Sequence, residues 1–103
     1  MADPMKIRAN LVGDLTEVKV LMNHEMETGQ RKDAQGQTIP AWFIQSVNAT
    51  YNGKIVLTAQ WGPAISKNPF LSFKFKGGAK GEKVTITWTD NRGDKRTDEA
   101  TIA

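Results

Sequence analysis

The residues best suited to chemistry lie in one long polar segment, residues 22–44, which holds the only histidine of the chain, His24, and two of its four methionines, Met22 and Met26. In an extended chain these three side chains would point the same way. Two thioethers with an imidazole form a soft donor set that suits Cu(I). A copper site is therefore one hypothesis. Met22 also continues the apolar alternation of the preceding segment, and methionine often fills gaps in cores, so core packing is the simpler interpretation.

Few residues of this chain could support other kinds of chemistry. The absence of cysteine excludes a thiol nucleophile, a disulfide scaffold and a zinc–thiolate site. A lone histidine without a partner serine or cysteine cannot form a nucleophilic triad. Glu25 and Glu27 lie near His24, but adjacent acidic residues on a loop are usually solvated charges. We therefore predict no catalytic residue, no cofactor site and no enzyme activity, and we expect His24 to be a partly exposed loop residue.

The bulk composition is that of one domain, residues 1–103. The net charge is +3, and the fourteen cationic residues are interleaved with eleven acids, which gives little support to nucleic-acid binding. No apolar run approaches the roughly 18 residues needed to cross a bilayer, so no membrane association is expected. Residues 1–11 lack the continuous apolar region of a signal peptide, which taken alone points to the cytoplasm.

Period-two alternation of apolar residues dominates the chain and indicates strands. Asn52-Gly53 between two such patterns predicts a tight hairpin. Strict alternation places Ile44 and Val47 on opposite faces of their strand. The seven expected strands are residues 5–11, 16–22, 42–51, 55–61, 70–76, 84–89 and 97–102. Seven short strands in about 100 residues favour an all-β, immunoglobulin-like two-sheet sandwich, with a small barrel as the alternative.

One run of residues carries a family resemblance. Residues 24–33, His-Glu-Met-Glu-Thr-Gly-Gln-Arg-Lys-Asp, closely resemble a signature of the Z subunit of the sulfur-oxidation (Sox) carrier complex. The resemblance continues through residues 39–41, 61–63, 66–70 and 90–94, and it covers essentially the whole chain. The first run and Lys67-Asn68-Pro69-Phe70 are specific, whereas the turn motifs between strands are not. Some members carry proline where this chain has Glu25.

The resemblance implies a non-catalytic role without a cofactor. The Z subunit of that family forms a heterodimer with a Y subunit, whose cysteine on a flexible glycine-rich C-terminal segment carries thiosulfate and its sulfur intermediates between the oxidising enzymes. It implies the periplasm, reached without a signal peptide of its own by export with the partner, and this replaces the cytoplasmic interpretation. The alternatives are a periplasmic copper-binding sandwich using Met22, His24 and Met26, and a stand-alone carbohydrate- or peptide-binding module.

We expect the polar loop and the turn at residues 67–70 to form a partner-facing end of the sandwich, because specific polar residues in loops are poorly explained by folding alone. The resemblance also implies that the chain makes transient contacts with other Sox enzymes. The isolated chain is expected to form a homodimer through the surface meant for the Y subunit, and the wet side chains Ser72, Lys74 and Lys76 should stay outside it. The expected partner-binding residues are His24, Met26, Glu27, Thr28, Gly29, Arg31, Lys67, Asn68, Pro69 and Phe70.

Overall fold

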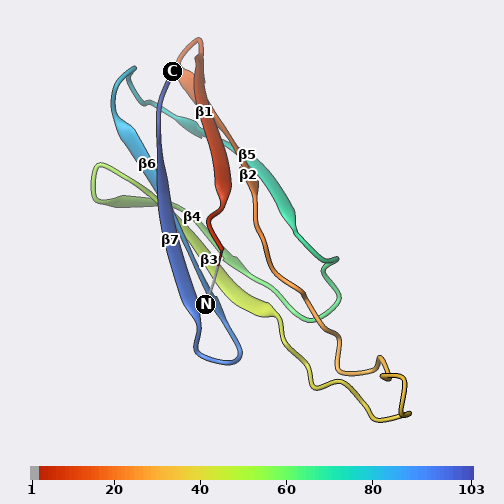
Figure 1. The fold of residues 1–103 in the computed structure, drawn as a ribbon. Helices are drawn as coiled ribbons and strands as arrows, with labels where there is room; N and C mark the ends of the chain where they lie inside the picture. Colours follow the sequence, from red (N-terminus) through yellow and green to blue (C-terminus); the bar gives the residue numbers. More distant parts are fainter. Residues whose placement is uncertain (1–2) are drawn as a thin grey trace.

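Seven antiparallel strands form two stacked sheets in the computed structural model, which describes residues 3–103 (Figure 1). The first sheet has the order β1-β2-β5 and the second the order β4-β3-β6-β7. The bounds are β1 Lys6–Val12, β2 Leu15–Leu21, β3 Ile44–Tyr51, β4 Lys54–Gln60, β5 Phe70–Lys76, β6 Lys83–Asp90 and β7 Lys95–Thr101. The predicted all-β, immunoglobulin-like two-sheet sandwich is confirmed. The described residues include no helix long and apolar enough to cross a membrane.

The core follows the period-two pattern of the sequence. Val18 and Val20 of β2 face Val84 and Ile86 of β6, and all four side chains are fully buried between the sheets. Burying one such side chain contributes about 1.5–3 kcal/mol. Trp88 continues the inward row of β6 and is also buried, as the alternation predicts.

Strand β3 departs from strict alternation. Ile44 and Val47 are both completely buried, although their spacing would place them on opposite faces of a regular strand. The register between β3 and β6 shifts between Ile44 and Ser46, which is the signature of a β-bulge. A bulge adds one residue to one strand and turns the following side chains over. The expectation of opposite faces was therefore wrong, because the register is set by pairing with β6.

Backbone hydrogen bonds join the two sheets on the side where β1 lies next to the C-terminal end of the chain. Ala9 of β1 forms a parallel bridge with Ile102, and Ala103 exchanges backbone hydrogen bonds with this strand, at 2.9 Å to Ala9 and 3.1 Å from Leu11. The far edges are β4 and β5. Several apolar side chains there pack on the core while remaining half-exposed, and we call this surface the open side. Its members are Val56, Leu57, Ala59, Trp61, Ile65, Leu71 and Phe73.

The long polar segment folds back on itself as an irregular hairpin, residues 24–42, which we call the arm. Glu27 and Trp42 exchange two backbone hydrogen bonds, of 2.6 and 3.0 Å, and Lys32 bridges Thr38 further out. Residues 30–38 are all exposed. Figure 1 shows the arm, coloured orange to yellow, projecting from one end of the sandwich, and the whole molecule measures 53 × 21 × 20 Å. A two-stranded hairpin is marginal on its own, so its base must be held by the sandwich.

The loop after β5 provides a test of packing at the other end of the sandwich. Gly78 has a positive φ of +96°, and an added Cβ would overlap the Oγ1 of the buried Thr16. Gly81 has a similar φ of +89°, but open space lies around it. We expect Gly78→Ala to lower the free energy of unfolding by about 1–3 kcal/mol more than Gly81→Ala. Urea-induced unfolding measures the difference, and equal losses would contradict the close packing of Gly78 on Thr16.

Candidate functional site

The base of the arm is fastened to the turn that precedes β5. The backbone N–H of His24 donates to Oδ1 of Asn68 at 3.1 Å, and the N–H of Asn68 donates to the carbonyl of His24 at 2.9 Å. Beside them Lys67 Nζ lies 3.3 Å from Glu25 Oε2. Asn68 has a φ of +53°, a left-handed conformation that asparagine tolerates better than most residues. The two segments that the sequence predicts to share one end of the sandwich therefore do lie together.

A buried carboxylate, Asp90 at the end of β6, holds the arm from the other sheet. Its Oδ2 accepts hydrogen bonds from Nε2 of His24 at 3.0 Å and from Nε1 of Trp42 at 2.8 Å. Its Oδ1 accepts from the backbone N–H groups of Arg92 at 3.0 Å and Asp94 at 2.8 Å. Four donors thus surround a side chain with no exposed surface, and this satisfies the general requirement that buried polar groups be paired.

These donors fix the charge of Asp90. Burial raises the pKa of a carboxylate, but the hydrogen bonds from His24, Trp42 and the backbone outweigh it and hold the pKa of Asp90 below its usual value. The Nδ1 of His24 accepts the backbone N–H of Met26 at 3.1 Å, so the ring proton belongs on Nε2, where it meets Asp90. In this tautomer the imidazole donates to Asp90 and accepts from the N–H of Met26 at the same time, without a second charge.

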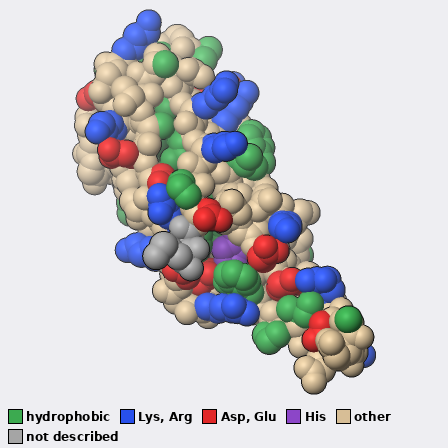
Figure 2. Space-filling view, in the orientation of Figure 1, with side chains coloured by type: hydrophobic (Ala, Val, Ile, Leu, Met, Phe, Trp, Pro, Cys, Tyr) green, Lys and Arg blue, Asp and Glu red, His purple; other side chains and the backbone are tan. Residues whose placement is uncertain are grey.

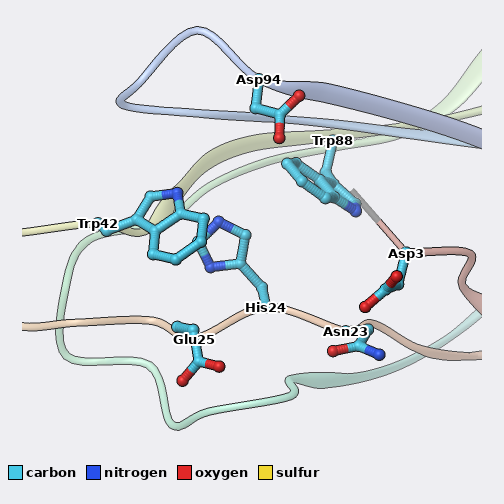
Figure 3. Close-up of a pocket in the computed structure, with 7 residues that line it drawn as sticks. All are labelled: Asp3, Asn23, His24, Glu25, Trp42, Trp88 and Asp94. Carbon is cyan, nitrogen blue, oxygen red and sulfur yellow. The ribbon is translucent and has the colours of Figure 1, made fainter. Parts of the chain in front are cut away.

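The imidazole of His24 lies between two indole rings, with centroids 5.0 Å from Trp42 and 5.1 Å from Trp88 (Figure 3). Its side chain is only 2% exposed, so the expectation of a partly exposed loop histidine was wrong. The reason is a partner 66 residues away, Asp90, that draws the ring into the sandwich. The remaining space is a pocket of about 110 Å³, lined by Asp3, Asn23, His24, Glu25, Trp42, Trp88 and Asp94.

The possible copper donors have other partners. Both nitrogens of His24 are engaged in hydrogen bonds, and the sulfur of Met26 accepts the backbone N–H of Ile44 at 3.3 Å. Met26 also adopts a φ of +53°, which breaks the extended run that would align it with Met22. The described residues contain no group of three histidine, cysteine or acidic side chains that could hold a metal. A copper ion would have to displace the bonds that fasten the arm.

The ten predicted partner-binding residues fall into three groups. His24, Met26 and Pro69 are buried, so they position the arm and the turn rather than present a contact surface. Glu27 and Gly29 are half-buried. Gly29 is needed at its position because its φ is +86° and a Cβ would press against Ala41. The exposed members are Thr28, Arg31, Lys67, Asn68 and Phe70.

Within this site the arm is stiffened by a bidentate pair. Arg31 donates to both carboxylate oxygens of Glu27, at 3.0 and 2.6 Å, and this hydrogen bonding lowers the pKa of Glu27.

The roles of Asp90 and Trp42 were not predicted from the sequence. The signal for Asp90 was present: it occupies the next inward position after Val84, Ile86 and Trp88, where a carboxylate can remain only with buried partners.

The charge of Asp90 predicts a pH dependence. A carboxylate with a lowered folded-state pKa stabilises the fold above its unfolded pKa of about 3.9, and the contribution disappears as pH falls through the folded value. We expect Asp90→Asn to reduce the free energy of unfolding by about 2–4 kcal/mol at pH 7. The deficit relative to wild type should shrink as pH falls below about 4. Urea unfolding from neutral to acidic pH measures it, with the exposed Asp14→Asn as control; a deficit independent of pH would contradict an ionised Asp90.

The burial of His24 predicts a contrast between two residues of the same arm. His24→Ala leaves Asp90 and the Met26 N–H short of a partner and opens a cavity between two tryptophans, so we expect a loss of about 2–4 kcal/mol. Arg31→Ala removes an exposed, solvent-screened ion pair and should lower the stability far less than His24→Ala does. Thermal unfolding measures both. A His24→Ala protein as stable as Arg31→Ala would show that the buried network does not hold the arm.

Solved structures with the same fold support the architecture. A superoxide reductase crystal structure in the oxidised state aligns with 99% of this chain and 89% of its own, at 16% identity and a TM-score of 0.64. The hypothetical protein PH1083 from Pyrococcus horikoshii OT3 aligns over 99% and 89%, at 18% identity and 0.63. A superoxide reductase (neelaredoxin) from Archaeoglobus fulgidus, the E12V variant in the reduced form, aligns over 97% and 86%, at 19% identity and 0.59. At such identities the likeness concerns the fold alone.

Sequence comparison identifies the family. No curated protein sequence matches the chain. The family model described as "Sulphur oxidation protein SoxZ" matches residues 5–101. This span includes the arm, the turn at residues 67–70 and the Asp90 turn, the parts of the site that fasten to one another. The chain therefore belongs to the SoxZ family of sulfur-oxidation proteins.

Proposed function

We propose that this chain is the non-catalytic Z subunit of a heterodimeric sulfur carrier that serves thiosulfate oxidation in the periplasm. The observation that carries the proposal is the family match over residues 5–101. The chain has no cysteine, so covalently carried sulfur would reside on a Y-type partner whose cysteine binds it. The role of this chain is to support that partner and to help present the carrier to the enzymes of the system. Export would occur in complex with the partner.

The open side suits the permanent subunit contact. Its seven side chains are apolar and uncharged, and they lie between the edge strands β4 and β5. The cores of stable interfaces are depleted in charge and rich in such residues, and an uncovered edge strand is a common site of pairing with a second chain. We therefore assign the open side to the Y subunit. In the absence of that subunit the same surface would account for a homodimer of the isolated chain.

The arm and the turn at residues 67–70 together form what we call the arm end. This end suits transient contacts. Its exposed members Arg31, Lys67 and Phe70 project at one end of the long molecule, and the buried network of His24 and Asp90 holds their backbone in place. A preorganised loop loses less entropy on binding than a free one. This end is our candidate for the transient docking of carrier to enzyme.

The proposal predicts a one-to-one complex with the Y-type partner. Co-expressed Y subunit and this chain should elute together in size-exclusion chromatography at micromolar concentration, with neither thiosulfate-oxidising activity nor bound sulfur on this chain alone. Separate elution of two folded proteins would refute the carrier role.

The location of the Y interface is tested with two neighbouring residues. Ile65 is half-buried on the open side, and Ser66 beside it is exposed. We expect Ile65→Asp to weaken the complex with the Y subunit by at least about tenfold, equivalent to ~1.4 kcal/mol, because a charge would be buried there. Ser66→Asp should leave the affinity within about twofold, well under that 1.4 kcal/mol. Isothermal titration calorimetry measures the affinity of each variant for the Y subunit, with samples first shown to be thermally stable. Equal affinities of the two variants would place the Y subunit elsewhere.

A further inference from the structure

The outer surface of the sheet β1-β2-β5 carries an ordered array of side chains. Its inward positions fill the core, so the alternate positions of each strand point to solvent. The register places twelve outward residues in four rows across the sheet, and we call this surface the basic face. The rows are Lys6, Leu21, Phe70; then Arg8, Lys19, Ser72; then Asn10, Glu17, Lys74; and finally Val12, Leu15, Lys76.

The excess positive charge of the protein is gathered on this face. Five cationic side chains and one carboxylate give it a formal charge of +4, more than the +3 of the whole chain. Glu17 lies between two of them, 3.6 Å from Lys19 Nζ and 3.7 Å from Lys74 Nζ. The other three, Lys6, Arg8 and Lys76, form no ion pair with any residue that the structure describes. Figure 2 shows blue side chains over the part of the molecule where β1, β2 and β5 run.

Folding alone gives no reason for this arrangement. Arg8 stands directly opposite Lys19 in the register of β1 and β2, and like charges at such cross-strand positions destabilise a sheet. The outer face of the second sheet is mostly uncharged. Its neutral positions carry Ser46, Asn48, Thr50, Thr58, Thr85, Thr87, Thr89 and Thr97. Of its charged positions in the register of β6 and β7, Lys83 and Glu99 form an ion pair at 2.9 Å, and Lys95 is the third. The basic face is thus a feature of one sheet and not a general device for solubility.

An apolar contact borders the charge at the end near the arm. Leu21 and Phe70 are paired in register and are 42% and 62% exposed. Phe70 follows directly on the turn of Lys67 and Asn68 that fastens the arm. The basic face and the arm end are therefore continuous, with an exposed aromatic side chain where they join. An aromatic anchor beside a charged area is a common composition of protein contact surfaces.

We propose that the basic face docks an acidic surface of a second protein, one of the enzymes that act on the sulfur carrier, with Phe70 as the apolar contact. The inference rests on the proposed carrier function and adds the surface and the chemistry of its transient partner. Opposite charges accelerate encounter and permit release, whereas a permanent interface over five cations would desolvate them at high cost. A face with a central carboxylate and a single aromatic ring lacks the stacking platform that single-stranded nucleic acids use.

The test compares two double variants of equal charge change in the intact Y–Z carrier. Arg8→Glu with Lys76→Glu alters the basic face at two cations without ion pairs. Lys54→Glu with Lys95→Glu makes the same change on exposed residues of the other sheet. Surface plasmon resonance against each purified Sox enzyme is run at about 50 mM and about 200 mM NaCl, because screening distinguishes exposed charge contacts. We expect the first variant to slow association with at least one enzyme by roughly tenfold at low salt, and the control by less than about twofold.

A third variant separates charge from the apolar contact. Phe70→Ala should speed dissociation from the same enzyme while leaving the salt dependence unchanged, since affinity at packed anchors is mostly a matter of dissociation rate. Equal effects of the two double variants, or association that does not respond to salt, would overturn the proposal. Tighter binding of the carrier to a DNA oligonucleotide or to anionic lipid vesicles than to any enzyme would overturn it as well. Co-elution with the Y subunit is measured independently, so failure here is distinguishable from failure of the carrier role.

Discussion

The buried carboxylate of Asp90 is the constraint on which the functional end of this protein depends. A charge with no exposed surface must find donors inside the protein, and Asp90 finds them in three separate parts of the chain. His24 belongs to the start of the arm, Trp42 to its end, and the backbone of Arg92 and Asp94 to the β6–β7 turn. Satisfying one side chain therefore brings both roots of the arm against the sandwich. The polar tip can then project, because its base is already ordered.

The regular part of the fold could be predicted from the sequence because each strand is a local pattern. Apolar residues alternate with polar ones in β2 and β6 because each sheet has one face in the core and the other in solvent. Val18, Val20, Val84 and Ile86 are on the core faces. That pattern places strands and their inward faces without knowledge of their neighbours. It failed at Ile44 and Val47, where the bulge is created by the partner strand β6 and leaves no mark in the spacing.

The candidate site was less predictable, because its interactions join residues far apart in sequence. The segments around His24 and Asn68 were expected to share one end of the sandwich, and they do. His24 and Met26 nevertheless face inward, whereas neighbours such as Arg31 reach solvent. Exposure could not be inferred from loop character, because it is decided by whether a distant group such as Asp90 needs a partner. Polar residues in a loop with no period can equally be contact surface or buried support.

The proposed role places opposite demands on the surface, and this chain separates them in space. A subunit that never leaves its partner gains from an apolar, uncharged contact, as on the open side around Leu57 and Phe73. A carrier that visits several enzymes must bind each one briefly, and exposed charge suits this because it speeds encounter more than it slows release. Such charges are found on the outer surface of the β1-β2-β5 sheet, with Arg8 directly against Lys19 at some expense to folding. The two surfaces adjoin along β5, where Leu71 and Phe73 pack on the core while Ser72 and Lys74 alternate with them on the outer face, so a side chain of one surface can be changed without replacing one of the other. That separation allows a protein without catalytic groups to take part in a reaction sequence through its surfaces alone.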